Sequence, residues 1–205
     1  MAEFVSDSIF HGFFHLINNK NLIMNKLILF LAFTLIIFNA GAQGLYITKD
    51  AKINFNSSTS LEDIVAESNQ ATTIIDIEKN VVKFSVLTTS FKFRRALMEE
   101  HFNENYMESV KFPKANFTGK VVTSIDWKSE KPVITDIKGT LTMHGVSNEV
   151  TLKAQITPGK NKITATAEIK VTPESFGIVI PSAVRDKIAK EVTILIGAGY
   201  APYKQ

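Results

Sequence analysis

Apolar and polar residues alternate along most of the chain after residue 44, and this period of two predicts β-strands. The clearest example is 150–156, where every second residue is Val, Leu, Ala or Ile. The predicted strands, in chain order, are 45–56, 72–78, 82–86, 111–123, 133–143, 150–156, 163–171 and 192–198. Short turns join most of them, which favours antiparallel neighbours.

Within residues 91–119 a short stretch with a helical period lies between two strands. The large apolar residues of this segment recur at steps near 3.6, so they share one face of a helix: Leu97, Met98, Phe102 and Tyr106. Pro113 then ends the helix. We expect a short amphipathic helix between two strands, acting as a plug or lid at the end of a barrel. Weaker helical patterns occur over 57–67 and 181–190.

The predicted strands number about eight, and such a set can close into a barrel or stack into a sandwich. A barrel is favoured because closure leaves no unpaired edge strand. The inward positions also mix large residues, such as Phe84 and Phe117, with small ones, such as Ala165 and Ala167. Small inward residues leave space, and a barrel of about eight strands can hold one small ligand. We therefore predict an all-β fold, an eight-stranded antiparallel barrel with one or two short helices, over 43–205.

The N-terminal region has the pattern of a secretory signal peptide. Residues 27–38 are almost wholly apolar, follow the positive Lys26 and precede the Ala-Gly-Ala of 40–42. The apolar run has about a dozen residues, whereas a membrane-spanning helix needs about 20, so a retained anchor is the weaker alternative. We expect translation to start at Met24, with an upstream extension and the signal peptide together making up 1–42. Cleavage would leave a periplasmic or secreted protein without a stable membrane span.

Composition narrows the chemistry. The formal net charge is only +3 and no Lys/Arg stripe with interleaved aromatics is present, so nucleic-acid binding is not predicted. No cysteine is present, which excludes disulfides, thiolate nucleophiles and cysteine metal sites. His101 and His144 lack the ligand spacing of a zinc site, and we expect hydrogen bonds to a turn or helix instead. Without a Gly-x-Ser-x-Gly elbow or a Gly-rich phosphate loop, the sequence predicts no catalytic residue, metal ligand or cofactor.

Two motifs and a C-terminal pattern carry a family resemblance. Residues 97–119 read LMEEHFNENYMESVKFPKANFTG, residues 139–152 read GTLTMHGVSNEVTL, and Phe176-Gly177 precede a final apolar strand. They resemble the helix-to-strand signature, the Gly-x-Leu-Thr-x-His-Gly-Val signature and the C-terminal pattern of the YceI-like family. The likeness covers nearly the whole chain after the signal segment. It implies an exported, lipocalin-like barrel that holds a long polyisoprenoid, such as a quinone tail or prenyl lipid, in its interior.

The resemblance changes how the inward apolar residues are interpreted. Taken alone, such an aromatic set is more often plain core than ligand pocket. In a polyisoprenoid-binding barrel the same residues would line the cavity. The expected ligand-binding residues are Phe84, Phe91, Phe93, Leu97, Met98, Phe102, Tyr106, Phe117, Ala165, Ala167 and Phe176. The nearby cations Lys92, Arg94 and Arg95 are interpreted equally as partners of a polar head group and as solubilising charges.

Two other functional classes stay open at this point. An interaction or stress-related module would have a barrel filled by its own side chains and no ligand, so the volume of the interior separates the two classes. A lipid-modifying enzyme would need a cluster of polar groups with perturbed acidity inside the barrel, and the sequence shows none. The head group and chain length of the lipid, and the pairing of two barrels into a homodimer, are also left open.

Overall fold

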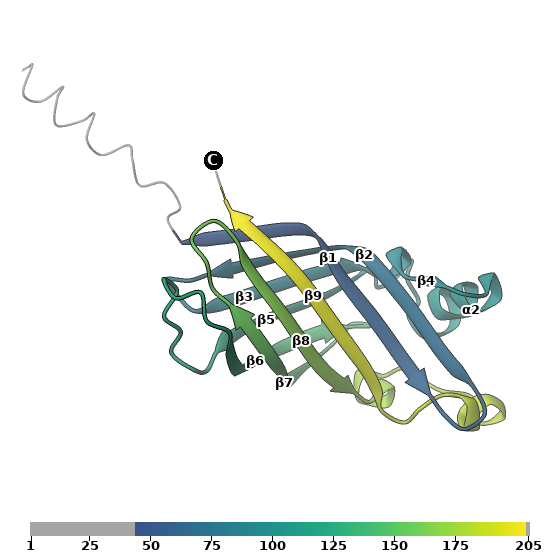
Figure 1. Ribbon diagram of the computed structural model, residues 1–205. Coiled ribbons are helices and arrows are strands. Elements are labelled where there is room, and N and C mark those ends of the chain that lie inside the picture. Colours follow the sequence, from purple (N-terminus) through teal and green to yellow (C-terminus); the bar gives the residue numbers. More distant parts are fainter. Residues whose placement is uncertain (1–43, 204–205) are drawn as a thin grey trace, which may run out of the picture. The chain divides into compact units, whose positions relative to one another are not determined.

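Eight long strands close on themselves as an antiparallel barrel (Figure 1). The computed structural model describes residues 44–203, and the predicted signal peptide lies outside them. The long strands are β1 (Leu45–Ser58), β2 (Asp63–Asp76), β3 (Val81–Leu87), β5 (Lys114–Val121), β6 (Val133–Met143), β7 (Val146–Thr157), β8 (Ile163–Val171) and β9 (Val192–Pro202). They pair in the order β1-β9-β8-β7-β6-β5-β3-β2, and β2 pairs with β1 to complete the circle. The predicted all-β, eight-stranded antiparallel barrel is confirmed.

The alternation in the sequence corresponds to the inner and outer faces of the barrel. On β7, Leu152, Ala154 and Ile156 are buried, whereas the residues between them are exposed. On β8, Ile163 and Ile169 are buried in the same way. Successive side chains of a strand point to opposite faces, so one apolar face per strand is enough to build the interior.

A tight turn joins β6 to β7 at one end of the barrel. His144 and Gly145 join β6 to β7 with φ angles of 50° and 75°, and Met143 and Val146 pair across them. Two consecutive positive φ angles are typical of a two-residue hairpin loop whose twist matches that of the flanking strands. This tight turn fixes the position of the His144 side chain at the end of the barrel.

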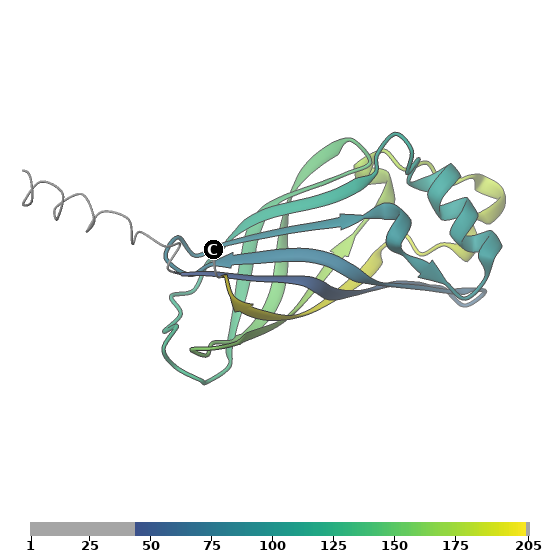
Figure 2. The same cartoon turned by 90° about the horizontal axis from the view of Figure 1, so that it is seen from above.

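The predicted amphipathic helix lies in the connection from β3 to β5. The elements of this connection are the 3₁₀ turn η2 (Thr88–Ser90), the two-residue strand β4 (Lys92–Phe93), α2 (Ala96–His101) and the π-helical turn η3 (Phe102–Tyr106). β4 pairs with the early part of β2. We call α2 and η3 together the lid. Figure 2 shows the lid at one end of the barrel, beside the yellow-green connection from β8 to β9.

The connection from β8 to β9 contains two 3₁₀ helices, η4 (Pro173–Phe176) and η5 (Ser182–Lys187). The second helix predicted over 181–190 is therefore confirmed in the shorter form of η5. Gly177 ends η4 with a φ of 72°, in the left-handed region where a side chain is strained. This glycine allows the chain to turn and extend across the same end of the barrel as the lid.

The weak helix expected over 57–67 is wrong, because β2 already begins at Asp63. Ser58 and Asp63 pair directly across a tight β1–β2 turn. Inside that turn the Thr59 hydroxyl accepts a hydrogen bond of 3.2 Å from the backbone N–H of Glu62. Cross-strand pairing with β1 continues along the whole of β2, and this tertiary contact overrides a weak local preference.

Candidate functional site

The barrel contains a cavity of about 360 Å³ at the end that the lid and η5 cover. All eight long strands contribute inward-facing side chains to its wall. The β8–β9 connection adds Ile178, Ile180 and Val184. Pockets that bind small molecules typically have volumes of about 300–1,000 Å³. The cavity is therefore large enough for an organic ligand.

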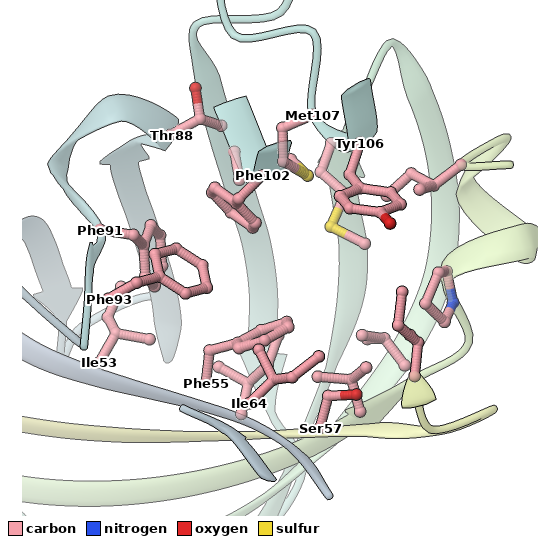
Figure 3. Close-up of a pocket in the computed structure, with 18 of the residues that line it drawn as sticks. Ile53, Phe55, Ser57, Ile64, Thr88, Phe91, Phe93, Phe102, Tyr106 and Met107 are labelled. Atoms are coloured by element: carbon pink, nitrogen blue, oxygen red, sulfur yellow. The ribbon is translucent and has the colours of Figure 1, made fainter. Parts of the chain in front are cut away.

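Four phenylalanines form one side of the cavity beneath the lid (Figure 3). Phe102 of η3 lies at their centre, with its ring centroid 5.0 Å from that of Phe93 and 5.7 Å from that of Phe91. Its ring also meets Phe55 of β1 edge to face, at 6.0 Å. Aromatic pairs in such geometries contribute about 0.5–1.5 kcal/mol each beyond the burial of area. These contacts hold the lid against β1 and β4.

Two hydroxyl groups of the inner wall, those of Ser57 and Thr88, are hydrogen-bonded to the backbone. The Ser57 hydroxyl accepts a hydrogen bond of 2.9 Å from the backbone N–H of Ala189. The Thr88 hydroxyl donates one of 3.3 Å to the carbonyl of Phe112. Burial raises the pKa of Tyr106, so its hydroxyl stays protonated and uncharged at neutral pH. The wall therefore suits a hydrocarbon better than a charged group.

Charged side chains gather where the cavity meets solvent. Arg95 and Glu62 form an ion pair there, and His101 and Lys187 also line the cavity. Leu97 of the lid also lines the cavity and is 60% exposed. We call these five residues the mouth. An apolar cavity with a charged mouth matches an amphipathic molecule whose polar end stays near water.

A carboxylate fastens the lid to the strand before it. Glu99 of α2 accepts a hydrogen bond of 2.6 Å from Lys92 Nζ and one of 3.3 Å from the backbone N–H of Phe93. The bond from Lys92, opposed in part by desolvation, lowers the pKa of Glu99. Farther along, Asn103 Nδ2 donates a hydrogen bond of 2.9 Å to the carbonyl oxygen of Glu99. The Ser109 hydroxyl donates a hydrogen bond of 2.7 Å to Asn103 Oδ1. The lid is thus tied to its flanking segments at both ends.

His144 joins the lid's following loop to the β8–β9 connection. Its Nε2 is hydrogen-bonded with Glu108 Oε2 at 2.8 Å, and its Nδ1 with the carbonyl oxygen of Phe176 at 3.1 Å. The ring also lies edge to face with Phe112, at 4.7 Å between centroids. The expectation that His144 fixes a turn through hydrogen bonds is confirmed.

The structure divides the eleven predicted ligand-binding residues among three places. Eight of them line the cavity: Phe84, Phe91, Phe93, Leu97, Met98, Phe102, Tyr106 and Phe117. Ala165 and Ala167 instead line a second cavity of about 40 Å³ farther along the barrel. Phe176 lines neither cavity and packs into the core, 1% exposed. Contact of any of these residues with a ligand stays a prediction.

Several residues of the cavity wall are not among the predicted ligand-binding residues. Ile53 and Phe55 stand on the inward face of β1, and the alternation of that strand already distinguished them. Lys187 and Glu62 come from a 3₁₀ helix and a turn, where no period indicates the direction of a side chain. Of the three cations considered for a head group, only Arg95 lines the cavity.

Comparison with known families and structures agrees with this architecture. The model of the family described as "YceI-like domain" matches residues 45–198. No curated protein sequence matches the chain. Within residues 44–203, no helix is long and apolar enough to cross a membrane, and no three His, Asp or Glu side chains gather as a metal site.

Three solved structures share the fold at low sequence identity. A polyisoprenoid-binding domain from Saccharophagus degradans, implicated in plant cell wall breakdown, has a TM-score of 0.66 at 13% identity and covers 78% of this chain and 99% of its own. BcnA from Burkholderia cenocepacia has a TM-score of 0.62 at 14% identity, and the match covers 74% of this chain and 96% of BcnA. A YCEI protein from Campylobacter jejuni has a TM-score of 0.54 at 18% identity, and the match covers 68% of this chain and 85% of that protein.

Proposed function

The chain belongs to the YceI-like domain family, and on that premise we propose that it carries an apolar lipid of the polyisoprenoid class inside its barrel. One observation carries the proposal, namely the apolar cavity of about 360 Å³ beneath the lid. The Saccharophagus degradans domain, which shares the fold, is described as polyisoprenoid-binding, and this supports the choice of lipid.

Burial of the hydrocarbon supplies the binding free energy in this proposal. Each methylene removed from water contributes about 0.8 kcal/mol. Phenylalanine, isoleucine and valine side chains of the wall take the place of water around the tail. The Ser57 and Thr88 hydroxyls keep their protein partners when the tail enters. The site therefore selects for apolar length and shape rather than for a functional group.

The mouth would hold the polar end of the lipid. Arg95 and Lys187 provide positive charge there, and Glu62 neutralises part of it. An alcohol or a singly charged head group fits this balance. The lid carries Leu97 and Met98 toward the opening, so movement of the lid would admit and release the tail.

The volume of the cavity weighs against the alternative of an interaction module with a filled barrel. In such a module, side chains would occupy the roughly 360 Å³ that this barrel leaves open. A lipid-modifying enzyme is not proposed, because its chemistry would require charged or nucleophilic groups at the centre of the cavity. The titratable groups of the wall stand instead at the mouth and on the lid.

Export is part of the proposal and rests on the sequence of 24–42. A carrier outside the cytoplasm would shield a lipid tail in the aqueous space between or beyond membranes. Cell fractionation with an antibody to the barrel tests this part. A protein that stays in the cytoplasm with residues 24–42 still attached would contradict it.

Lipid extraction of the protein purified from its own cells, followed by mass spectrometry, tests the proposed ligand class. We expect a prenyl lipid in near-stoichiometric amount. Ala115→Phe would place a ring inside the cavity and should displace the lipid, because Ala115 lines the wall. Thr118→Phe is the matched control, since Thr118 lies on the same strand and faces outward. Protein that is reproducibly empty, or lipid retained equally by both variants, would contradict the proposal.

A further inference from the structure

The interior of the barrel is divided into two compartments by three side chains. Phe84, Phe117 and Leu152 line both the cavity of about 360 Å³ and the second cavity of about 40 Å³. We call these three residues the partition. We call the larger cavity the front cavity and the smaller one the rear cavity. On β3, Val86 lines the front cavity and Val82, on the other side of Phe84, lines the rear one; on β5, Ala115 lines the front cavity.

The partition is a built feature of the β-sheet. Phe84 of β3 and Phe117 of β5 are direct cross-strand partners. The Phe117 ring lies over Gly119, where an added Cβ would come within 2.4 Å of Phe117 Cζ. Phe117 and Leu152 are 4% and 5% exposed. A glycine two residues along thus gives the Phe117 ring its place across the interior, and the packing keeps it there.

Beyond the partition the interior is nearly filled. Ala154, Ala165, Ala167 and Ala198 leave only the small rear cavity. The Tyr200 side chain lines this space, and its hydroxyl lies 3.2 Å from the Thr73 hydroxyl. The Thr73 hydroxyl in turn donates a hydrogen bond of 2.9 Å to the carbonyl oxygen of Lys83. A space of about 40 Å³ exceeds what one water requires but is well below what one benzene ring occupies. No isoprene unit fits there while the partition stands.

From this division we infer that the partition limits the length of lipid that the barrel can bury to about three isoprene units. A cavity of about 150 Å³ in another protein binds one benzene molecule. By that measure, about 360 Å³ accommodates roughly 14 carbon atoms, close to three isoprene units. Further units of a quinone-length tail would remain at the mouth. This inference rests on the proposed function and specifies its ligand.

A chain-length series tests the inference. Geraniol, farnesol and geranylgeraniol have the same head group and two, three and four isoprene units. Their affinities can be measured by displacement of the fluorescent probe N-phenyl-1-naphthylamine from the purified protein. We expect farnesol to bind at least about tenfold tighter than geraniol, and geranylgeraniol to stay within about twofold of farnesol.

Removing the partition should change the preference. Phe84→Ala joins the two cavities, so geranylgeraniol should bind at least about fivefold tighter than farnesol. Adding Ala165→Leu to that variant refills the rear space and should abolish the gain. Circular dichroism checks the fold, and if Phe84→Ala does not fold, the milder Phe84→Leu carries the same comparison.

The outcomes separate the two proposals. Failure of all three alcohols to displace the probe would overturn the proposed function. Binding that strengthens by more than about twofold from farnesol to geranylgeraniol in the unmodified protein would overturn the length limit and leave the proposed function standing. An unchanged preference in folded Phe84→Ala or Phe84→Leu would also overturn the role of the partition.

Discussion

The Phe102 ring lies 5.0 Å from the Phe93 ring, centroid to centroid, and this contact joins the lid to β4. Phe102 is also the ring on which Phe55 and Phe91 converge. We therefore expect Phe102→Ala to loosen the lid. Because Phe102 is only half-buried, the free energy of unfolding should fall by about 2 kcal/mol, less than for a fully buried phenylalanine.

The same variant should release a bound prenol faster, which stopped-flow displacement of the lipid would measure. Val110→Ala is the control, because Val110 lies in the same connection and is fully exposed. It should change neither stability nor release. Equal release rates in Phe102→Ala and the unmodified protein would show that the phenylalanine contacts do not hold the lid.

Acid should weaken the hold on the lid through Glu99. The pKa of Glu99 in the folded protein lies below its ordinary value of 4.5, chiefly because of the hydrogen bond from Lys92. Its stabilisation is therefore complete above pH 4.5 and is lost as the pH falls through the lowered value. We expect lipid release to accelerate on acidification in that range.

Glu99→Gln should remove this dependence. The variant should release lipid faster than the unmodified protein at pH 7 and show a smaller increase on acidification. Glu100→Gln is the matched control, since Glu100 is the exposed neighbour on α2. A pH profile of release that is the same in all three proteins would rule out Glu99 as the origin.

Gly119 should not tolerate a side chain. A Cβ at this position would lie 2.4 Å from Phe117 Cζ and 2.9 Å from the carbonyl oxygen of Lys138. Gly119→Ala should therefore lower the free energy of unfolding by about 1–3 kcal/mol, as overpacking of a core does. Urea denaturation measures the difference.

Gly197→Ala provides the comparison for that experiment. Gly197 also lies in a long strand, but nothing stands within 4 Å of an added Cβ there. We expect its stability to be unchanged or slightly raised, because alanine restricts the unfolded chain more than glycine does. Equal destabilisation of both variants would mean that the Phe117 contact is not the cause.

Charge at the mouth should matter for an anionic lipid and not for a neutral one. Lys187→Ala should weaken binding of farnesyl phosphate by about two- to fivefold, the scale of exposed ion pairs. Binding of farnesol should not change. Arg94→Ala is the control, because Arg94 is exposed on the neighbouring segment and does not line the cavity. Equal effects of the two variants would indicate a general effect of net charge.

Most of the barrel could be predicted from the sequence because a strand with one buried face must alternate. The pattern of 150–156 or 163–171 admits no helix with the same burial. The first half of β2 was not predicted because several of its residues are polar and two of its buried positions hold the small residues Ala66 and Ser68. Pairing with β1 holds this segment in an extended conformation. Such a contact between strands gives no periodic pattern in the local sequence.

The candidate site could be predicted only in part for a related reason. A period of two gives the face on which a side chain lies but not its height along the barrel. Ala165 and Phe84 were both assigned to the interior, and only the structure shows that Ala165 lies behind the partition. Phe176 belongs to a short 3₁₀ helix, where no period indicates direction. Lys187 also belongs to a 3₁₀ helix, so its side-chain direction could not be predicted from the sequence.

The pairing of β1 with both β2 and β9 sets an order for the assembly of the protein. β9 is synthesised after the other strands of the barrel, and it lies between β1 and β8. The β1–β9 pairing that closes the barrel therefore joins residues far apart in the sequence. Contacts between residues so far apart make folding slow. The barrel therefore closes around its cavity only after β9 has been synthesised.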